Sequence, residues 1–278
     1  MRLKDLPYGV QLRLHREGDT CRVNVYSSAR KGLTVVGSGG SGHLIDAAVE
    51  ALSEPLPKGT WIGSDEAGKG DLFGGISVCA LCCPADGAGA LRRLGARDSK
   101  GMSREAVRRV AGDVVDSGLF PFRLEIITPE EYNSRMESWR DRGGNSHDLL
   151  ASLHGRAITS LLKEDCAAEE LIVDRFCSAS RLRPFLPAEA PTLNMKVRGE
   201  SNPAVAAASI IARQAYMDSL AELSRQYAVD LSPGSGASAD RALQRLVDIH
   251  GPPVLRKTAK LHFRNARRLL EPGSQPLS

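Results

Sequence analysis

The sequence contains no run of about 20 apolar residues, which is the length that a membrane-spanning helix needs. Its first residues also lack the basic stretch and the apolar stretch of a secretory signal peptide. These absences argue against a membrane protein and against a secreted protein. We therefore expect a cytoplasmic protein without a membrane partner, and we expect it to be a monomer.

The cysteines are too poorly spaced to form a zinc site. Three of the six cysteines lie together, at positions 79, 82 and 83. No second pair of cysteine or histidine residues at ligand spacing completes a set of four zinc ligands. We expect these three cysteines to be small apolar side chains inside a buried strand.

Acidic residues are missing from residues 256–268, a segment rich in arginine and lysine. A second basic group consists of Arg92, Arg93, Arg97, Lys100, Arg104, Arg108 and Arg109. The net charge of +4 is small, so it permits a polyanionic partner without requiring one. Each basic group is predicted to be either a solvated helix face or a contact for a polyanion.

The composition is that of a folded protein, with 42% hydrophobic and 25% charged residues. A length of 278 residues suffices for one large domain and one small domain. We predict a small domain at 1–52 and a linker at 53–59, which contains prolines and polar residues. The main domain is expected at 60–270, followed by a flexible tail at 271–278.

The small domain is predicted to be a sheet with one helix. Alternation of apolar residues predicts strands at 10–14, 21–26 and 33–36. The glycine-rich run at 37–42 lacks the Gly-Lys-Ser/Thr ending of a phosphate-binding loop, so we interpret it as a flexible connection. Helical spacing predicts a helix at 44–52.

The main domain is predicted to combine strands with helices. Short apolar runs predict strands that begin at 61 and at 74, and further strands at 122–127, 170–174 and 192–197. Helical spacing predicts helices at 91–97, 103–116, 145–163, 203–227 and 238–250, and one that begins at Pro129. Ser103 is a suitable N-cap, and proline is favoured at the first helical position.

A strand that runs directly into Asp65 and Glu66 is an unusual arrangement for a structural loop. Successive side chains of a strand point to opposite faces, so we expect the strand to end at these acids. Gly68 and Gly70 would then supply the turn. Adjacent carboxylates bind Mg²⁺ or Mn²⁺ or act as acids and bases, and Lys69 suits a phosphate. A capped turn with a solvated acid pair remains the alternative.

The predicted strand at 170–174 also ends on an acid, Asp174. Two parallel strands that end in aspartate would place Asp65 and Asp174 at one edge of a sheet, where open α/β folds bind ligands. Asp218 lies inside the predicted helix at 203–227. On its own, Asp218 is interpreted as a surface acid paired with a neighbouring arginine.

Together these segments resemble the type 2 ribonuclease H family and, within it, the ribonucleases HIII most closely. The resemblance covers residues 60–268. It rests on residues 63–71, Asp98-Ser99-Lys100, 145–158, Asp174, 206–213, 231–235 and 259–263.

The resemblance implies an α/β fold, namely a ribonuclease H-like mixed sheet flanked by helices. It also implies a small N-terminal α+β domain, similar to the TATA-box-binding protein, that binds substrate. The implied reaction is hydrolysis of the RNA strand of RNA/DNA hybrids by two divalent ions, Mg²⁺ or Mn²⁺, which leaves 5′-phosphate and 3′-hydroxyl ends. The implied catalytic residues and metal ligands are Asp65, Glu66, Asp174 and Asp218. The implied substrate contacts are Gly68, Lys69, Gly70, Ser99 and Lys100.

Two features favour type III over type II: the N-terminal domain, and Lys69 at a position where type II enzymes usually have arginine. There is one departure from the type II pattern. Counted from Ser209, Met217 stands where the fourth acid is usual, and Asp218 follows it. Two alternatives remain open, namely a type II-like enzyme that cuts at single ribonucleotides in DNA, and a non-catalytic hybrid-binding protein.

Overall fold

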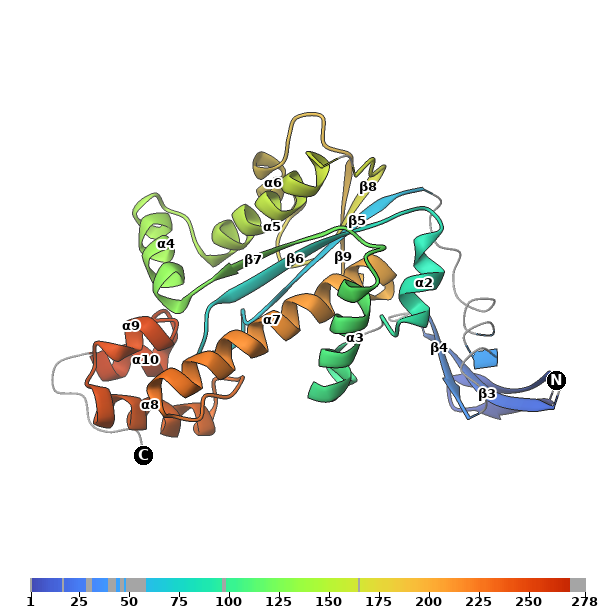
Figure 1. Ribbon diagram of the computed structural model, residues 1–278, viewed down its shortest axis with the longest axis horizontal. Helices are drawn as coiled ribbons and strands as arrows, with labels where there is room; N and C mark the ends of the chain where they lie inside the picture. Colours follow the sequence, from blue (N-terminus) through green and yellow to red (C-terminus); the bar gives the residue numbers. More distant parts are fainter. Residues whose placement is uncertain are drawn as a thin grey trace. The chain divides into compact units, whose positions relative to one another are not determined.

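The computed structural model describes residues 2–16, 18–28, 32–39, 44–45, 48, 59–96, 99–164 and 166–270. The chain divides into two compact units, 1–58 and 59–278 (Figure 1). Most of the predicted linker and the predicted tail at 271–278 lie outside the described residues. No helix in the described part of the chain is long and apolar enough to cross a membrane.

The first unit contains a four-stranded antiparallel sheet in the order β1-β2-β3-β4. Its strands are β1 Arg2–Leu6, β2 Gly9–Arg16, β3 Asp19–Ser28 and β4 Gly32–Ser38. The three predicted strands are confirmed, whereas β1 was not predicted because its two leucines are three residues apart and do not alternate. The glycine-rich run was expected to be a connection, but its first residues continue β4.

One face of this sheet forms a small core. Leu12, Cys21 and Val23 are buried there, together with Ala48. The partly buried Leu44 belongs to the same cluster, and the residues at 44, 45 and 48 are helical. The other residues of the helix predicted at 44–52 lie outside the described residues.

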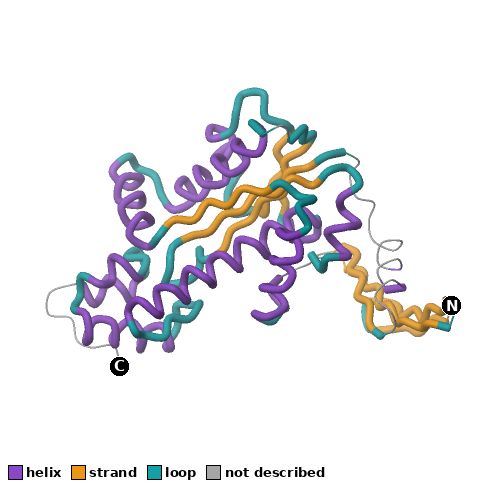
Figure 2. Tube along the Cα trace, viewed as in Figure 1, coloured by secondary structure: helices purple, strands orange, loops and turns teal. Residues whose placement is uncertain are grey.

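The second unit is built on a five-stranded mixed sheet in the order β7-β6-β5-β8-β9 (Figures 1 and 2). β5 pairs with β6 in antiparallel fashion and with β8 in parallel fashion. All five predicted strands are confirmed, and β9 lies at one edge of the sheet. The strands are β5 Trp61–Ala67, β6 Ile76–Cys83, β7 Phe122–Ile127, β8 Glu170–Asp174 and β9 Thr192–Lys196.

Side-chain caps fix where several helices of the second unit begin. Ser103 caps α3, whereas Thr128 and Asn145 form capping boxes at the starts of α4 and α5. The helix predicted at 91–97 begins and ends earlier, at Gly87–Arg93 (α2). The other helices are α3 Arg104–Asp116, α4 Pro129–Asp141, α5 Ser146–Leu162, α6 Ala179–Leu182, α7 Pro203–Tyr227, α8 Ala237–His250, α9 Val254–Thr258 and α10 Arg264–Leu270.

Helices cover both faces of the sheet. Figure 1 shows α5 on one side of the strands and α7 on the other. α7 comes very close to β5 at Gly63, where a Cβ atom would lie 2.4 Å from the backbone of Ala204 and Val205. A side chain at position 63 would therefore push the helix away from the strand. This contact holds the start of α7 beside the strand that carries the two adjacent acids.

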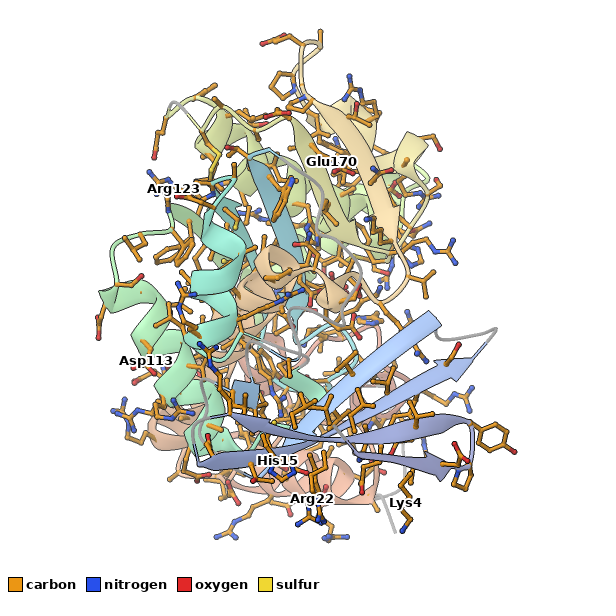
Figure 3. The ribbon with its side chains drawn as sticks, turned by 90° about the vertical axis from the view of Figure 1, so that its right-hand side faces the viewer. Lys4, His15, Arg22, Asp113, Arg123 and Glu170 are labelled. Carbon is orange, nitrogen blue, oxygen red and sulfur yellow. A yellow bond between two sulfur atoms is a disulfide. The ribbon has the colours of Figure 1, made fainter. Side chains whose placement is uncertain are left out.

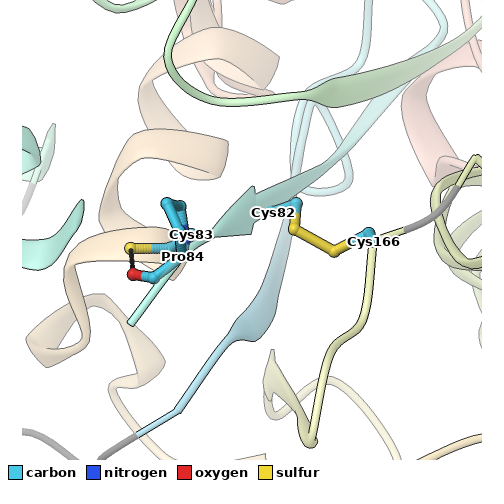
Figure 4. The surroundings of a disulfide bond; sticks show 4 residues. All are labelled: Cys82, Cys83, Pro84 and Cys166. Carbon is cyan, nitrogen blue, oxygen red and sulfur yellow. Dashed lines mark hydrogen bonds between the residues drawn. A yellow bond between two sulfur atoms is a disulfide. The ribbon is translucent and has the colours of Figure 1, made fainter. Parts of the chain in front are cut away.

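A disulfide bond joins Cys82 in β6 to Cys166, which precedes β8 (Figure 4). All three clustered cysteines lie in the buried strand β6, as expected, but the disulfide bond of Cys82 was not predicted, because its partner is 84 residues away and no local pattern reveals it. Cys79 and Cys83 are free and buried, as expected. Closing a loop of this length stabilises the fold by about 4.5 kcal/mol in the chain-entropy description.

Candidate active site

Asp65 and Asp174 are neighbours on adjacent strands. The last parallel pair of β5 and β8 is Ser64 with Val173, so Asp65 and Asp174 occupy the next position in the register. Side chains at matching positions of parallel strands point to the same face, and the two strands lie about 4.8 Å apart. The structure therefore brings these two predicted site residues together at the end of β8.

The adjacent acids Asp65 and Glu66 point to opposite faces of the sheet. The strand was expected to end at them, but β5 continues to Ala67 because β6 remains paired with it. Asp65 accepts a hydrogen bond from Ser209 on α7. The Oε2 atom of Glu66 lies 3.2 Å from the Nε2 atom of His154 on α5. The two carboxylates are thus held by helices on different sides.

Asp65 lies in a negative and partly buried environment. Burial is the main cause that raises its pKa, and the charges of Glu66 and Asp174 raise it further, to about 7. The Ser209 hydroxyl and the Glu66 amide act in the opposite direction. Asp174 accepts a hydrogen bond of 2.8 Å from the Gly199 amide. Within the described residues, no basic side chain forms an ion pair with Asp65 or Asp174.

Glu66, in contrast, lies between a histidine and a lysine. Burial alone would raise the pKa of Glu66, but the hydrogen bond and charge of His154, together with Lys69, lower it below its usual value. The Lys69 Nζ atom lies 3.6 Å from the Oε1 atom of Glu66. Lys69 also lies over the ring of Phe176, 5.5 Å from its centroid. Glu66 therefore stays ionised more easily than Asp65.

A buried hydrogen-bond chain fixes the orientation of Glu66. The Ser64 hydroxyl donates to the Cys79 carbonyl at 2.8 Å, so it accepts a hydrogen bond from His154 Nδ1, also at 2.8 Å. This leaves the Nε2 atom of His154 facing Glu66. His154 is fully buried, and the Phe176 ring stacks on it at 4.6 Å. His154 was not predicted as a site residue, although a histidine on the apolar face of a helix was a detectable signal.

The Gly68-Lys69-Gly70 turn follows directly after β5. Gly68 has a φ of 92°, and a Cβ atom there would lie 2.7 Å from the Tyr216 ring, so only glycine fits. Gly70 was expected to have a positive φ as well, but it does not. A Cβ at Gly70 would have no neighbour within 4 Å, so a ligand has room to approach its backbone.

Ser99 lies behind Asp65 rather than at the surface. It is 5% exposed, and its hydroxyl lies 3.2 Å from the Ser209 hydroxyl, which in turn bonds Asp65. The Ser99 carbonyl accepts a hydrogen bond from Arg213. The prediction that Ser99 contacts phosphate is untested, and its position indicates a role in holding Ser209. The side chain of Lys100 lies outside the described residues.

Asp218 does not lie with the other three acids. It is exposed on α7 and accepts a hydrogen bond of 2.8 Å from Gln214. Asp218 follows Ser209 by nine residues, which amounts to about two and a half helical turns and about 13 Å along the axis. Ser209 faces Asp65, so Asp218 points away from the site.

The oxygen donors of this site suit a divalent cation that is only partly enclosed by protein. In the part of the chain that the structure describes, no three carboxylate, thiol or imidazole groups converge to form a closed metal cage. Mg²⁺ is commonly held by one or two carboxylates, with water and substrate phosphate completing its coordination. Asp65 and Asp174 provide such a pair, and the negative charge around Asp65 favours a bound cation.

Comparisons of sequence agree on one family. A family model described as Ribonuclease HII matches residues 62–266. Ribonuclease HIII of Geobacillus sp. (strain WCH70) is 34% identical over 221 residues, which cover 77% of this chain and 71% of the relative. Ribonuclease HIII of Bacillus pumilus (strain SAFR-032) is 33% identical over 221 residues, covering 74% of this chain and 67% of the relative.

Solved structures with a similar fold agree with this family. The crystal structure of Bst-RNase HIII in complex with Mn²⁺ matches with a TM-score of 0.69 and 27% identity, covering 93% of this chain and 87% of that chain. RNase H3 of Aquifex aeolicus matches with a TM-score of 0.60 and 26% identity, covering 95% of this chain and 91% of that chain. Both matches include most of the first unit as well as the second.

Proposed function

The chain belongs to the ribonuclease HII family, and from this premise we propose that it is an endoribonuclease that hydrolyses the RNA strand of RNA/DNA hybrids. Its curated relatives are ribonucleases HIII. The observation that supports the proposal most strongly is the pairing of Asp65 and Asp174 at one end of the sheet, with Glu66 beside them. Such a set of carboxylates suits phosphodiester hydrolysis.

Asp65, Glu66 and Asp174 are the proposed catalytic residues and metal ligands. Two divalent cations, Mg²⁺ or Mn²⁺, would supply an activated water and neutralise the leaving 3′-oxygen, which gives 5′-phosphate and 3′-hydroxyl ends. Ser209 and His154 hold Asp65 and Glu66 in place from opposite sides of the sheet. Asp218, the fourth ligand implied by the family resemblance, is left out of this set because of its distance along α7.

The Gly68-Lys69-Gly70 turn is proposed to contact the RNA backbone near the cut. Double-helical nucleic acids of this type are recognised through phosphates and 2′-hydroxyls rather than through base edges. The open space at Gly70 lets the backbone approach such groups. Lys69 is held near Glu66 and offers a positive charge to the phosphate next to the metal site.

Residues 1–52 are proposed to form a substrate-binding domain. The face of the sheet opposite the small core carries Lys4, Arg13 and Arg22, all exposed. Figure 3 shows Lys4 and Arg22 extending from the same side of the sheet. Arg13 pairs with Arg22 across β2 and β3, and none of the described side chains on this face is acidic. A basic sheet face suits a phosphate backbone.

The enzyme is proposed to act as a monomer in the cytoplasm. All residues of the proposed site come from one chain, so no second copy is needed to complete it.

A cleavage assay tests this function. One duplex contains several consecutive ribonucleotides and the other a single ribonucleotide within DNA, and each is incubated with Mg²⁺ or Mn²⁺. We expect metal-dependent cutting of the first duplex, with 5′-phosphate products. Preferential cutting of the second duplex would favour a type II-like enzyme, and absence of cutting with either metal would contradict the proposal.

Replacing His154 by phenylalanine is expected to lower kcat by roughly 10- to 100-fold, the usual effect of losing a group that orients a metal ligand. The change keeps an aromatic ring beside Phe176 but removes the partner of Glu66. Mn²⁺ affinity, measured by titration calorimetry, should fall as well.

Two further variants serve as controls for His154. His147→Phe, on the first turn of the same helix, should leave kcat and Mn²⁺ affinity unchanged. His154→Gln retains an N–H donor for Glu66 and should recover part of the loss. Unchanged Mn²⁺ affinity and kcat in His154→Phe would contradict the orienting role.

A further inference from the structure

Lys260 is a fully buried lysine that takes no part in the proposed chemistry. It is 0% exposed, and its Nζ atom donates hydrogen bonds to the carbonyls of Asp71 at 2.8 Å and Phe73 at 3.2 Å. The rings of Tyr132 and Tyr216 lie 5.8 and 5.9 Å from the same atom. The group is therefore enclosed by two acceptors and two aromatic faces.

Among the described residues, no carboxylate forms an ion pair with Lys260. The carboxylate of Asp71 accepts a hydrogen bond from the Gly234 amide at 2.7 Å. Burial lowers the pKa of Lys260 to about 7, although the charge of Asp71 opposes this shift. An apolar side chain at position 260 would avoid the free-energy cost of burying a charged group. We therefore attribute the role of Lys260 to the carbonyls that it binds.

Those carbonyls belong to the segment that leaves the Gly68-Lys69-Gly70 turn. The Lys260 amide donates to Leu72 at 2.9 Å, and the Gly74 amide donates to Thr258 at 3.0 Å. Phe73 and Ala259 form an antiparallel bridge between these hydrogen bonds. The C-terminal segment after α9 thus binds the turn segment through both its backbone and the side chain of Lys260.

Tyr216 connects the buried lysine to Gly68. Its hydroxyl donates to the Phe73 carbonyl at 3.0 Å, so that carbonyl accepts from both Tyr216 and Lys260. The Tyr216 ring is also the surface that Gly68 packs against, at a distance that excludes a Cβ atom. A change at Lys260 therefore affects both ends of the segment from Gly68 to Phe73.

We infer that Lys260 is a positioning residue for substrate: by fixing the carbonyls of Asp71 and Phe73, it holds the Gly68-Lys69-Gly70 turn in the shape that receives the RNA backbone. This inference rests on the proposed function of the turn. It makes the C-terminal segment a determinant of hybrid affinity, although Lys260 itself does not touch the substrate.

The test compares Lys260→Met with Lys257→Met, which removes an exposed lysine from α9, directly before this segment. Lys260→Met leaves the Asp71 carbonyl without its side-chain donor. We expect KM for an RNA/DNA hybrid to rise roughly tenfold, the scale of one unsatisfied buried group, while kcat changes by less than about twofold. Lys257→Met should leave both values unchanged.

Hydrogen exchange provides a readout that does not depend on activity. The backbone amides of residues 68–75 should exchange roughly tenfold faster in Lys260→Met than in Lys257→Met. Unchanged exchange and unchanged KM would overturn the inference. If wild type fails to cut hybrids, the proposed function fails, and exchange alone then decides whether Lys260 holds the turn.

If Lys260→Met does not fold, Tyr216→Phe takes its place. This change removes only the second donor to the Phe73 carbonyl and keeps the ring beneath Gly68. We expect a smaller rise in KM and a smaller increase in exchange at 68–75. The absence of both effects would overturn the inference.

Discussion

Asp65→Asn is expected to lower kcat on an RNA/DNA hybrid by roughly 10³-fold or more, because a neutral amide removes several kcal/mol of metal-based charge stabilisation. Asparagine has nearly the shape of aspartate, and Asp65 is partly buried beneath Ser209. Hybrid affinity should therefore change little. Single-turnover cleavage with Mg²⁺ and a separate binding measurement would distinguish the two quantities.

Asp218→Asn is the matched control for this prediction. Asp218 is an acid on α7 whose carboxylate bonds Gln214 and faces away from Asp65. We expect nearly normal turnover from this variant. Normal turnover by Asp65→Asn would remove the metal-ligand assignment, and a large loss in Asp218→Asn would restore Asp218 as a ligand.

Reversing three charges on the sheet of the first unit is expected to weaken hybrid binding by roughly 10²-fold at low salt. The variant carries Lys4→Glu, Arg13→Glu and Arg22→Glu, all on the exposed sheet face. Phosphate contacts supply salt-dependent affinity, so the dependence of Kd on salt concentration should become weaker. At saturating hybrid, kcat should stay close to wild type because the catalytic carboxylates belong to the other unit.

A charge-matched control distinguishes the effect of this sheet face on affinity from the effect of net charge alone. The control variant changes the net charge by the same amount through three exposed arginines of α7 and α8, namely Arg225→Glu, Arg241→Glu and Arg245→Glu. We expect a smaller loss of affinity from this variant. Equal losses in both triple variants would show that the sheet of the first unit has no special role.

Much of the second unit was predictable because its signals are local. β7 at Phe122–Ile127 has the predicted bounds, and α3 and α4 begin where Ser103 and Thr128 cap them. Caps and alternation depend on residues within one turn or one strand. Such signals are readable without knowing which segments meet in space.

The features that were missed depend on distant partners. β5 passes through Asp65 and Glu66 because β6 continues to pair with it. His154 was overlooked because its role requires Ser64 and Glu66, which lie far away in sequence. The position of Asp218 was equally hard to foresee, since counting along a motif does not show which face of α7 a residue occupies.

The Cys82–Cys166 bond also changes what a single cut does to this molecule. It turns the chain between the two cysteines into a covalent ring that contains α2 to α5 and β7. A protease that cleaves one peptide bond inside this ring produces no free fragment, because both pieces stay joined through sulfur. Only after reduction do the pieces separate, so electrophoresis without a reductant shows no fragment from a cut in this region.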